Sequence, residues 1–205
     1  EIQKSVTFLG SDSGSIQFAN SGQIMGDITF EQRGESDLPQ GLDVEGDLTW
    51  GDAGKLYLCH NLNARNIQLP LEVETNCTLD SISSVFIHAQ GELRATAIEG
   101  YNHVSMVANQ SVQLFDSIRV DSLRVVSETG AIRLWSPVVE TDTYQHYEGD
   151  INIMTNVTLQ NNEMSTDTAI FMEGIIVSQG TLTIIGNSFF PSPHSYEMIG
   201  LQLHQ

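Results

Sequence analysis

Residues that could act in acid–base or metal chemistry are scattered along this chain rather than gathered in motifs. The six histidines show no His-x-His, His-Glu-x-x-His or His-x₃-His spacing, so a metal site would have to be assembled from distant segments. Gly10-Ser-Asp-Ser-Gly14 approaches the nucleophile elbow of serine hydrolases but is not followed by a helical segment, and it is interpreted as a turn. We therefore predict no catalytic residue, no metal ligand and no resident cofactor, and do not expect an enzyme.

Aromatic side chains are the better candidates for contact with a ligand. Trp135 follows the alternating segment Ala131–Leu134, and alternation places it on the opposite side from Leu134, facing outward. An exposed ring of this kind could stack on a sugar, with packing against a turn as the alternative. Tyr144 and Tyr147 complete the predicted ligand-binding set, again with turn packing as the alternative.

A polysaccharide lyase or hydrolase is the enzymatic alternative. Such a site needs two carboxylates about 5–9 Å apart, or clustered acids with a basic residue on one face. Stacked coils could bring Glu72 close to Glu92 or Asp116. The cations available in the same part of the chain are Arg94, Arg119, Arg124 and Arg133.

The elements that must position these residues are short alternating segments separated by Gly, Asn, Ser, Thr or Asp. Val85, Val104 and Leu123 recur at a constant interval, and Leu93, Leu114 and Leu134 recur at nearly the same one. Tighter steps separate Leu56, Leu71 and Val85. These spacings predict an all-β fold, a right-handed parallel β-helix (solenoid) with coils of roughly 15–21 residues. An antiparallel sandwich is the main competitor, but the chain has no Asn-Gly or Asp-Gly hairpin turn.

The same pattern divides the chain into three parts. Residues 42–188 form the predicted β-helix body. Residues 1–41 contain less regular strands and a polar loop, and could cap the first coil. Residues 189–205 begin near Pro191 and Pro193, which a central strand does not tolerate, so they are predicted to be a cap or a linker.

Composition limits the partners. Eight basic residues stand against 26 acidic ones, which gives a formal net charge of −18. Such a surface repels nucleic acid, whose phosphates need clusters of Lys and Arg. Scattered Ca²⁺ sites are kept as an alternative to a simply solvating acidic surface, although no Asp-x-Asp-x-Asp-Gly loop occurs. Apolar runs are a few residues long, whereas a membrane-spanning helix needs about 20, so no membrane insertion is expected.

The chain contains two cysteines, Cys59 and Cys77, whose separation is close to the length of one predicted coil. Both could therefore fall on adjacent rungs of the solenoid. Two buried thiols are the favoured interpretation, because free Cys behaves as a small apolar residue, and a disulfide is left open.

The chain also resembles a known class of protein. The segment Thr143–Ile153 reads Thr-Tyr-Gln-His-Tyr-Glu-Gly-Asp-Ile-Asn-Ile, and Asn156–Leu159 follows with Asn-Val-Thr-Leu. Gly180-Thr-Leu-Thr-Ile184 continues the pattern, and Gly26-Asp-Ile-Thr-Phe30 and Gly46-Asp-Leu-Thr-Trp50 echo it. These segments resemble the repeat of filamentous-haemagglutinin-type exoproteins, which include two-partner-secretion adhesins and autotransporter passengers.

The resemblance implies a β-helical stalk of a large bacterial protein that is secreted or exposed on the cell surface. The expected role is cell adhesion, with a glycan or a host surface receptor as partner. A subunit that stacks end to end into a filament is a further alternative.

Overall fold

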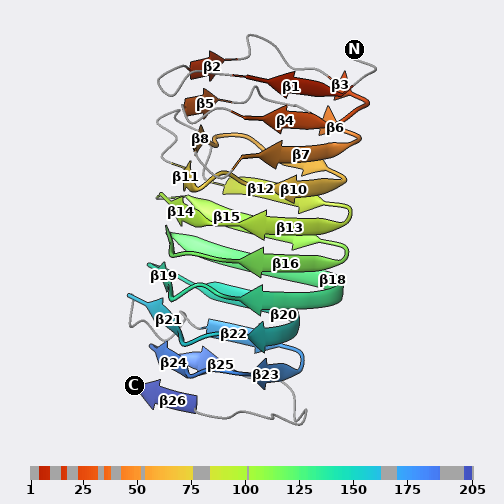
Figure 1. Ribbon diagram of the computed structural model, residues 1–205. Helices are drawn as coiled ribbons and strands as arrows, with labels where there is room; N and C mark the ends of the chain where they lie inside the picture. Colours follow the sequence, from red (N-terminus) through yellow and green to blue (C-terminus); the bar gives the residue numbers. More distant parts are fainter. Residues whose placement is uncertain are drawn as a thin grey trace.

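The computed structural model describes residues 5–9, 15–17, 23–31, 35–37, 43–51, 54–75, 84–100, 102–162, 170–189 and 201–204. Within these ranges every element is a β-strand, and no helix is present that could cross a membrane. The strand pairs are parallel, and successive coils stack along one axis (Figure 1). This confirms the predicted all-β, right-handed parallel β-helix.

Each coil passes through three faces, which we number 1 to 3 in the order in which the chain visits them from β3 onward. Face 1 contains β3 (Gln23–Ile24), β6 (Asp43–Val44), β9 (Leu62–Ala64), β12 (Ser84–Ala89), β15 (His103–Ala108), the first parts of β18 (Ser122–Leu134) and β20 (Gln145–Ile153), β22 (Ile170–Glu173) and β25 (Ser188–Phe189). Face 2 contains β1 (Val6–Phe8), β4 (Ile28–Phe30), β7 (Asp47–Trp50), β10 (Asn66–Gln68), β13 (Glu92–Ala95), β16 (Ser111–Leu114), the second parts of β18 and β20, and β23 (Ile176–Ser178). Face 3 contains β2 (Ser15–Gln17), β5 (Glu35–Asp37), β8 (Lys55–Tyr57), β11 (Glu72–Glu74), β14 (Ala97–Glu99), β17 (Ile118–Val120), β19 (Val138–Thr141), β21 (Val157–Asn161), β24 (Leu182–Ile185) and β26 (Leu201–His204).

The coil length varies more than the sequence indicated. On face 2 one row runs in register through Val6, Ile28, Leu48, Ile67, Leu93, Val112, Ile132, Ile151 and Ile176. The steps from Ile67 to Leu93 and from Ile151 to Ile176 are the longest, and both exceed the predicted range. Their extra residues lie between β11 and β12 and between β21 and β22. The turns therefore absorb insertions while the strands keep their register.

The core lies inside the coils because every second side chain points inward. Leu48, Ile67 and Leu93 are essentially inaccessible to solvent. Each such side chain contributes about 1.5–3 kcal/mol through burial. Near the N-terminal end, the stacked rings of Phe30 and Trp50 have centroids 4.8 Å apart, so aromatic residues continue the inward packing.

The predicted ladders are partly correct. Val85 pairs with Val104, and Val104 with Leu123, as expected. Leu114 pairs with Leu134, as expected. Leu93 does not pair with Leu114; it pairs with Val112, two residues earlier on β16.

The short coils predicted from the spacing of Leu56, Leu71 and Val85 are wrong. Leu56 pairs with Val73 rather than with Leu71. Leu71 instead lies in the turn before β11 and is 53% exposed.

The solenoid also extends past both boundaries drawn from the sequence. β1, β2, β4 and β5 precede residue 42 and pair in the same sheets as the body. At the other end β26 pairs with β24. These outer strands are short and are separated by longer polar segments, which weakens their periodic signal. Residues 191–200, with the two prolines, lie outside the described residues.

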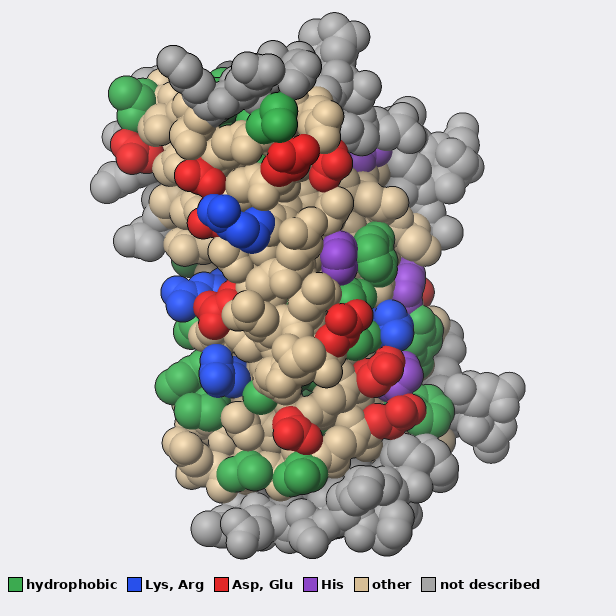
Figure 2. Space-filling view, turned by 90° about the vertical axis from the view of Figure 1, so that its right-hand side faces the viewer, with side chains coloured by type: hydrophobic (Ala, Val, Ile, Leu, Met, Phe, Trp, Pro, Cys, Tyr) green, Lys and Arg blue, Asp and Glu red, His purple; other side chains and the backbone are tan. Residues whose placement is uncertain are grey.

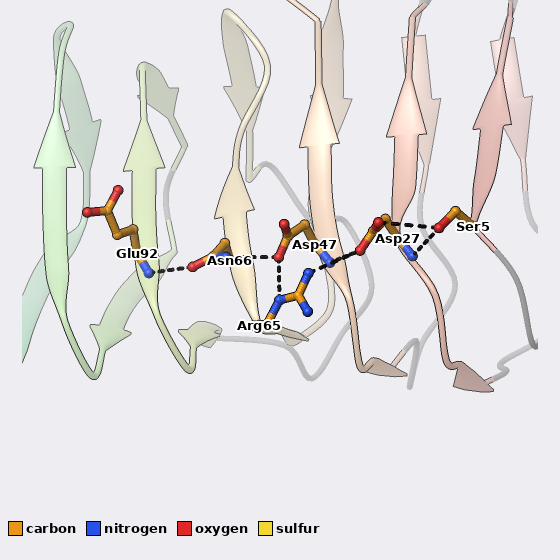
Figure 3. Close-up of polar contacts among 6 residues, drawn as sticks. All are labelled: Ser5, Asp27, Asp47, Arg65, Asn66 and Glu92. Carbon is orange, nitrogen blue, oxygen red and sulfur yellow. Dashed lines mark hydrogen bonds and ion pairs between the residues drawn. The ribbon is translucent and has the colours of Figure 1, made fainter.

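A ladder of polar side chains follows the short turn between faces 1 and 2 (Figure 3). The Oδ1 atom of Asp27 accepts a hydrogen bond from the Asp47 backbone N–H at 2.9 Å. Asn66 Nδ2 donates to Asp47 Oδ1 at 2.8 Å, and Asn66 Oδ1 accepts from the Glu92 N–H at 2.9 Å. Arg65 lies over this ladder, and its hydrogen bond lowers the pKa of Asp47. Side chains of this ladder therefore satisfy backbone donors of the next coil.

Cys59 is disulfide-bonded, so the favoured interpretation of two buried thiols is wrong for this residue. The chain's other cysteine, Cys77, lies outside the described residues.

Candidate functional site

Planar polar side chains line the outer surface of face 2. Equivalent outward positions on β10, β13, β16, β18 and β20 are occupied by Gln68, Arg94, Gln113, Arg133 and Asn152. Of these, Gln113 is only 9% exposed. We call this set the polar row. Neighbouring strands lie about 4.8 Å apart, so Arg94 and Arg133, two rungs apart, are separated along the axis by about 10 Å.

Two exposed aromatic rings border the polar row where the strands of face 2 end. Phe115 and Trp135 follow Gln113 and Arg133 by two residues, which places them on the same outward side. Their rings are stacked, with centroids 6.2 Å apart and planes 9° apart. They remain 41% and 37% exposed. We call them the aromatic pair.

Backbone hydrogen bonds hold the aromatic pair in position. The Phe115 N–H donates to Ala95 O at 2.9 Å, and the Trp135 N–H donates to Leu114 O at 2.8 Å. These bonds continue the ladder one residue past the strand ends. Both rings are therefore attached to backbone that the neighbouring coil fixes.

A hollow of about 290 Å³ lies beside the aromatic pair, and its lining includes Gly51, Gln68, Leu71, Arg94, Thr96 and Phe115. It combines an apolar wall with a guanidinium and an amide. Together, the polar row, the aromatic pair and this hollow form what we call the face 2 strip.

The face 2 strip has the chemistry of a carbohydrate contact surface. Flat aromatic rings can cover the apolar face of a sugar, while amide and guanidinium groups donate hydrogen bonds to its oxygens. Trp135 faces outward as alternation predicted, and its contact with a ligand stays a prediction. Phe115 was missed, although the same alternation from Val112 to Leu114 places it outward too.

Tyr144 lies on a different face from Trp135. It precedes β20 at the edge of face 1, where its hydroxyl is 3.1 Å from His103 Nδ1. The same nitrogen lies 2.6 Å from Ser122 Oγ, and Ser122 is only 2% exposed. Burial lowers the pKa of His103 and raises the pKa of Tyr144. The group is thus a half-buried hydrogen-bonded cluster.

Tyr147 is completely buried, so its place in the predicted ligand-binding set is corrected. Its hydroxyl donates to Gln145 Oε1 at 2.9 Å inside the solenoid. Tyr144 and Tyr147 are three residues apart in an extended segment, and an odd separation puts two side chains on opposite sides of the strand.

A second hollow, of about 720 Å³, lies on face 1, and Phe86, His88, Val107, Val126, Glu128 and Glu148 are among its lining residues. In Figure 2 the histidine side chains lie on the right of the view together with acidic side chains, whereas most of the Lys and Arg side chains visible in this view lie on the left.

We call this hollow the face 1 groove. One of its walls is formed by an ion pair. Arg124 Nη2 lies 2.9 Å from Glu148 Oε2 and neutralises it. At the other wall, Asn63 Nδ2 donates to Asp43 and leaves its Oδ1 to accept from His88 Nδ1 at 3.0 Å. This arrangement places a proton on Nδ1 of His88, which donates it to the Asn63 amide oxygen.

The carboxylates considered for an enzyme do not share one row. Glu72 lies on face 3, where it pairs with Lys55 at 3.0 Å. Glu92 lies on face 2, and Asp116 follows β16 in a turn. The four arginines are likewise divided among three faces, with Arg119 on face 3, Arg124 on face 1 and Arg94 and Arg133 on face 2.

Within the described part of the chain, no group of three or more His, Cys, Asp or Glu side chains is arranged to hold a metal ion. Comparison with protein-family models, with curated proteins and with solved structures finds no match to this chain.

Proposed function

We propose that this chain is a segment of a secreted or surface-exposed bacterial adhesin or exoprotein, a rigid β-helical stalk that binds a glycan along its face 2 strip. The observation that carries the proposal is the aromatic pair, two exposed and nearly parallel rings beside a row of amides and guanidiniums.

The architecture supports the stalk role. Strand pairing joins each coil to the coils directly before and after it, and the sheets run the length of the described solenoid without a break between domains (Figure 1). Parallel ladders on three faces resist bending in every direction. A binding strip that lies along the axis would then meet an extended ligand over several rungs.

Glycan binding can be tested with an array of neutral and acidic oligosaccharides, followed by calorimetry on the best ligand. Trp135→Ala and Phe115→Ala should each weaken binding roughly two- to twelvefold, because a stacked aromatic contact contributes about 0.5–1.5 kcal/mol beyond its buried area. Phe86→Ala is the matched control, since Phe86 is 39% exposed but lies on face 1. The strip is excluded as the site if both strip variants bind like the unaltered protein.

A polysaccharide-degrading enzyme is the second candidate, favoured by the face 1 groove. Glu128, Glu148 and His88 line one hollow large enough for several sugar units. Assays for new reducing ends and for unsaturated products should then detect turnover that Glu148→Gln abolishes. Turnover that is absent, or that persists in the variant, would remove this candidate.

A further inference from the structure

Among the described residues, face 2 presents the two cations that have the weakest ionic partners, Arg94 and Arg133. Arg133 forms no ion pair or side-chain hydrogen bond with any described residue, and Arg94 only approaches Glu92 at 3.6 Å. The remaining described cations have closer partners, which are Glu74 for Lys55 at 2.6 Å, Asp47 for Arg65 at 2.8 Å, Glu140 for Arg119 at 3.3 Å and Glu148 for Arg124 at 2.9 Å.

These two guanidiniums accompany the aromatic pair. Arg94 and Phe115 line the same hollow. Arg133 and Trp135 lie two residues apart on the same outward side of one coil. A guanidinium binds a carboxylate through two parallel hydrogen bonds, and these bonds are stronger than those to neutral oxygens. Each ring of the pair thus has a neighbouring group suited to an anion.

We propose that the face 2 strip recognises an acidic glycan whose sugar rings carry carboxylates, with Arg94 and Arg133 as the carboxylate-binding groups. This inference rests on the proposed function, since it assigns the charge of the glycan that the aromatic pair stacks against. The two arginines are about two rungs, or 10 Å, apart, so they would meet carboxylates on separate sugars.

The surrounding charge limits which acidic glycans fit. The whole chain carries a net charge of −18, and this field repels a continuous polyanion. Exposed charges are screened over about 8–10 Å at ordinary ionic strength, so the two arginines attract only groups close to them. A chain that alternates acidic and neutral sugars satisfies both conditions. A polyphosphate such as nucleic acid does not.

The test measures binding of four probes by calorimetry at fixed salt. They are a hexasaccharide of alternating glucuronate and N-acetylglucosamine, the same hexasaccharide with its carboxylates reduced to alcohols, a sulfated neutral hexasaccharide, and a single-stranded oligonucleotide. The carboxylate form should bind about tenfold more tightly than the reduced form. Arg94→Gln and Arg133→Gln should each diminish this preference while leaving the affinity for the reduced form unchanged. Arg119→Gln is the control, because Arg119 is exposed and lies on face 3.

The outcomes separate this inference from the proposed function. If the carboxylate and reduced forms bind with equal affinity, and Trp135→Ala loses binding to both, the charge preference is overturned and glycan binding at the strip stands. Tighter binding of the sulfated probe would overturn the carboxylate assignment. Binding of the oligonucleotide alone, or of none of the four probes when the array is also blank, would overturn both proposals.

Discussion

Tyr147 shows how a single polar atom is accommodated in the core. Its hydroxyl donates to Gln145 Oε1, and Gln145 Nε2 donates to the carbonyl oxygens of Gln160 at 2.7 Å and Val139 at 3.1 Å. Both side chains are fully buried, and the hydroxyl and amide groups satisfy one another. Burial raises the pKa of Tyr147, because the phenolate would have no water around it.

Tyr147→Phe should lower the free energy of unfolding at neutral pH by about 1–3 kcal/mol, because it leaves Gln145 Oε1 without its donor. Above a pH of about 10 the unfolded tyrosine ionises while the buried one stays protonated, so the unfolded state binds fewer protons. The unaltered protein therefore loses up to about 1.4 kcal/mol per pH unit from this residue, and the variant does not. Urea unfolding between pH 7 and 11 should show the two stabilities converging, and parallel curves would contradict the assignment.

The candidate site was only partly predictable from residue types. Alternation identified Trp135 as outward-facing, but a ligand surface needs several side chains together. Arg94, Gln113 and Arg133 align because the two coils that separate them are nearly equal in length and their turns are short. That alignment depends on the exact register, which residue types alone do not determine.

Among the elements, β18 and β20 contain the irregularity that the spacing rules do not anticipate. Their register shifts between Val126 and Ala131, so the residues between those positions face a single residue, Gly149. Gly149 has φ of +124°, and a Cβ there would lie 2.6 Å from the Ser127 carbonyl oxygen. The bulge therefore requires a residue without a side chain.

Gly149→Ala should destabilise the protein by about 1–3 kcal/mol through backbone strain at this bulge, with the carbonyl clash adding to it. Gly51→Ala is the matched control, because the nearest atom to its added Cβ is Phe30 O at an ordinary 3.5 Å. The comparison is made by urea unfolding of both variants. Equal stabilities would show that the backbone at Gly149 relaxes freely.

The incorrect pairing of Leu93 with Leu114 in the predicted ladder has a physical cause in how strands pair. Moving a strand by two residues keeps each side chain on its original side of the sheet, so apolar periodicity fits both registers. Apolar periodicity alone therefore allows Leu93 to pair with either Leu114 or Val112. The turn between β12 and β13 has only two residues, Gln90 and Gly91, and its length sets the register in which Leu93 pairs with Val112. The prediction of the fold class does not depend on this choice, because a strand shifted by two residues still stacks on its neighbour with the same side chains facing inward.

Taken as a whole, the molecule stacks like charges as well as like apolar groups. Parallel register puts Glu74 opposite Glu99, and Glu148 opposite Glu173. Such pairs lie about 4.8 Å apart along the axis and repel each other. The ion pairs that oppose this repulsion are largely solvent-exposed, and exposed pairs contribute only about 0–1 kcal/mol each.

We therefore expect added salt to stabilise this protein. Raising NaCl from about 0.01 M to about 1 M shortens the screening length from about 30 Å to about 3 Å, which weakens the self-repulsion of a chain with net charge −18. The thermal midpoint should rise by several degrees, since about 1 kcal/mol corresponds to roughly 2–4 °C for a domain of this size. Chloride is used instead of sulfate because sulfate also strengthens apolar burial. Glu99→Gln should raise the low-salt midpoint and reduce the response, since it removes one stacked carboxylate and loses only the weak 3.8 Å contact with Arg119. A midpoint that falls with salt would mean that ion pairs such as those of Lys55 outweigh the repulsion between coils.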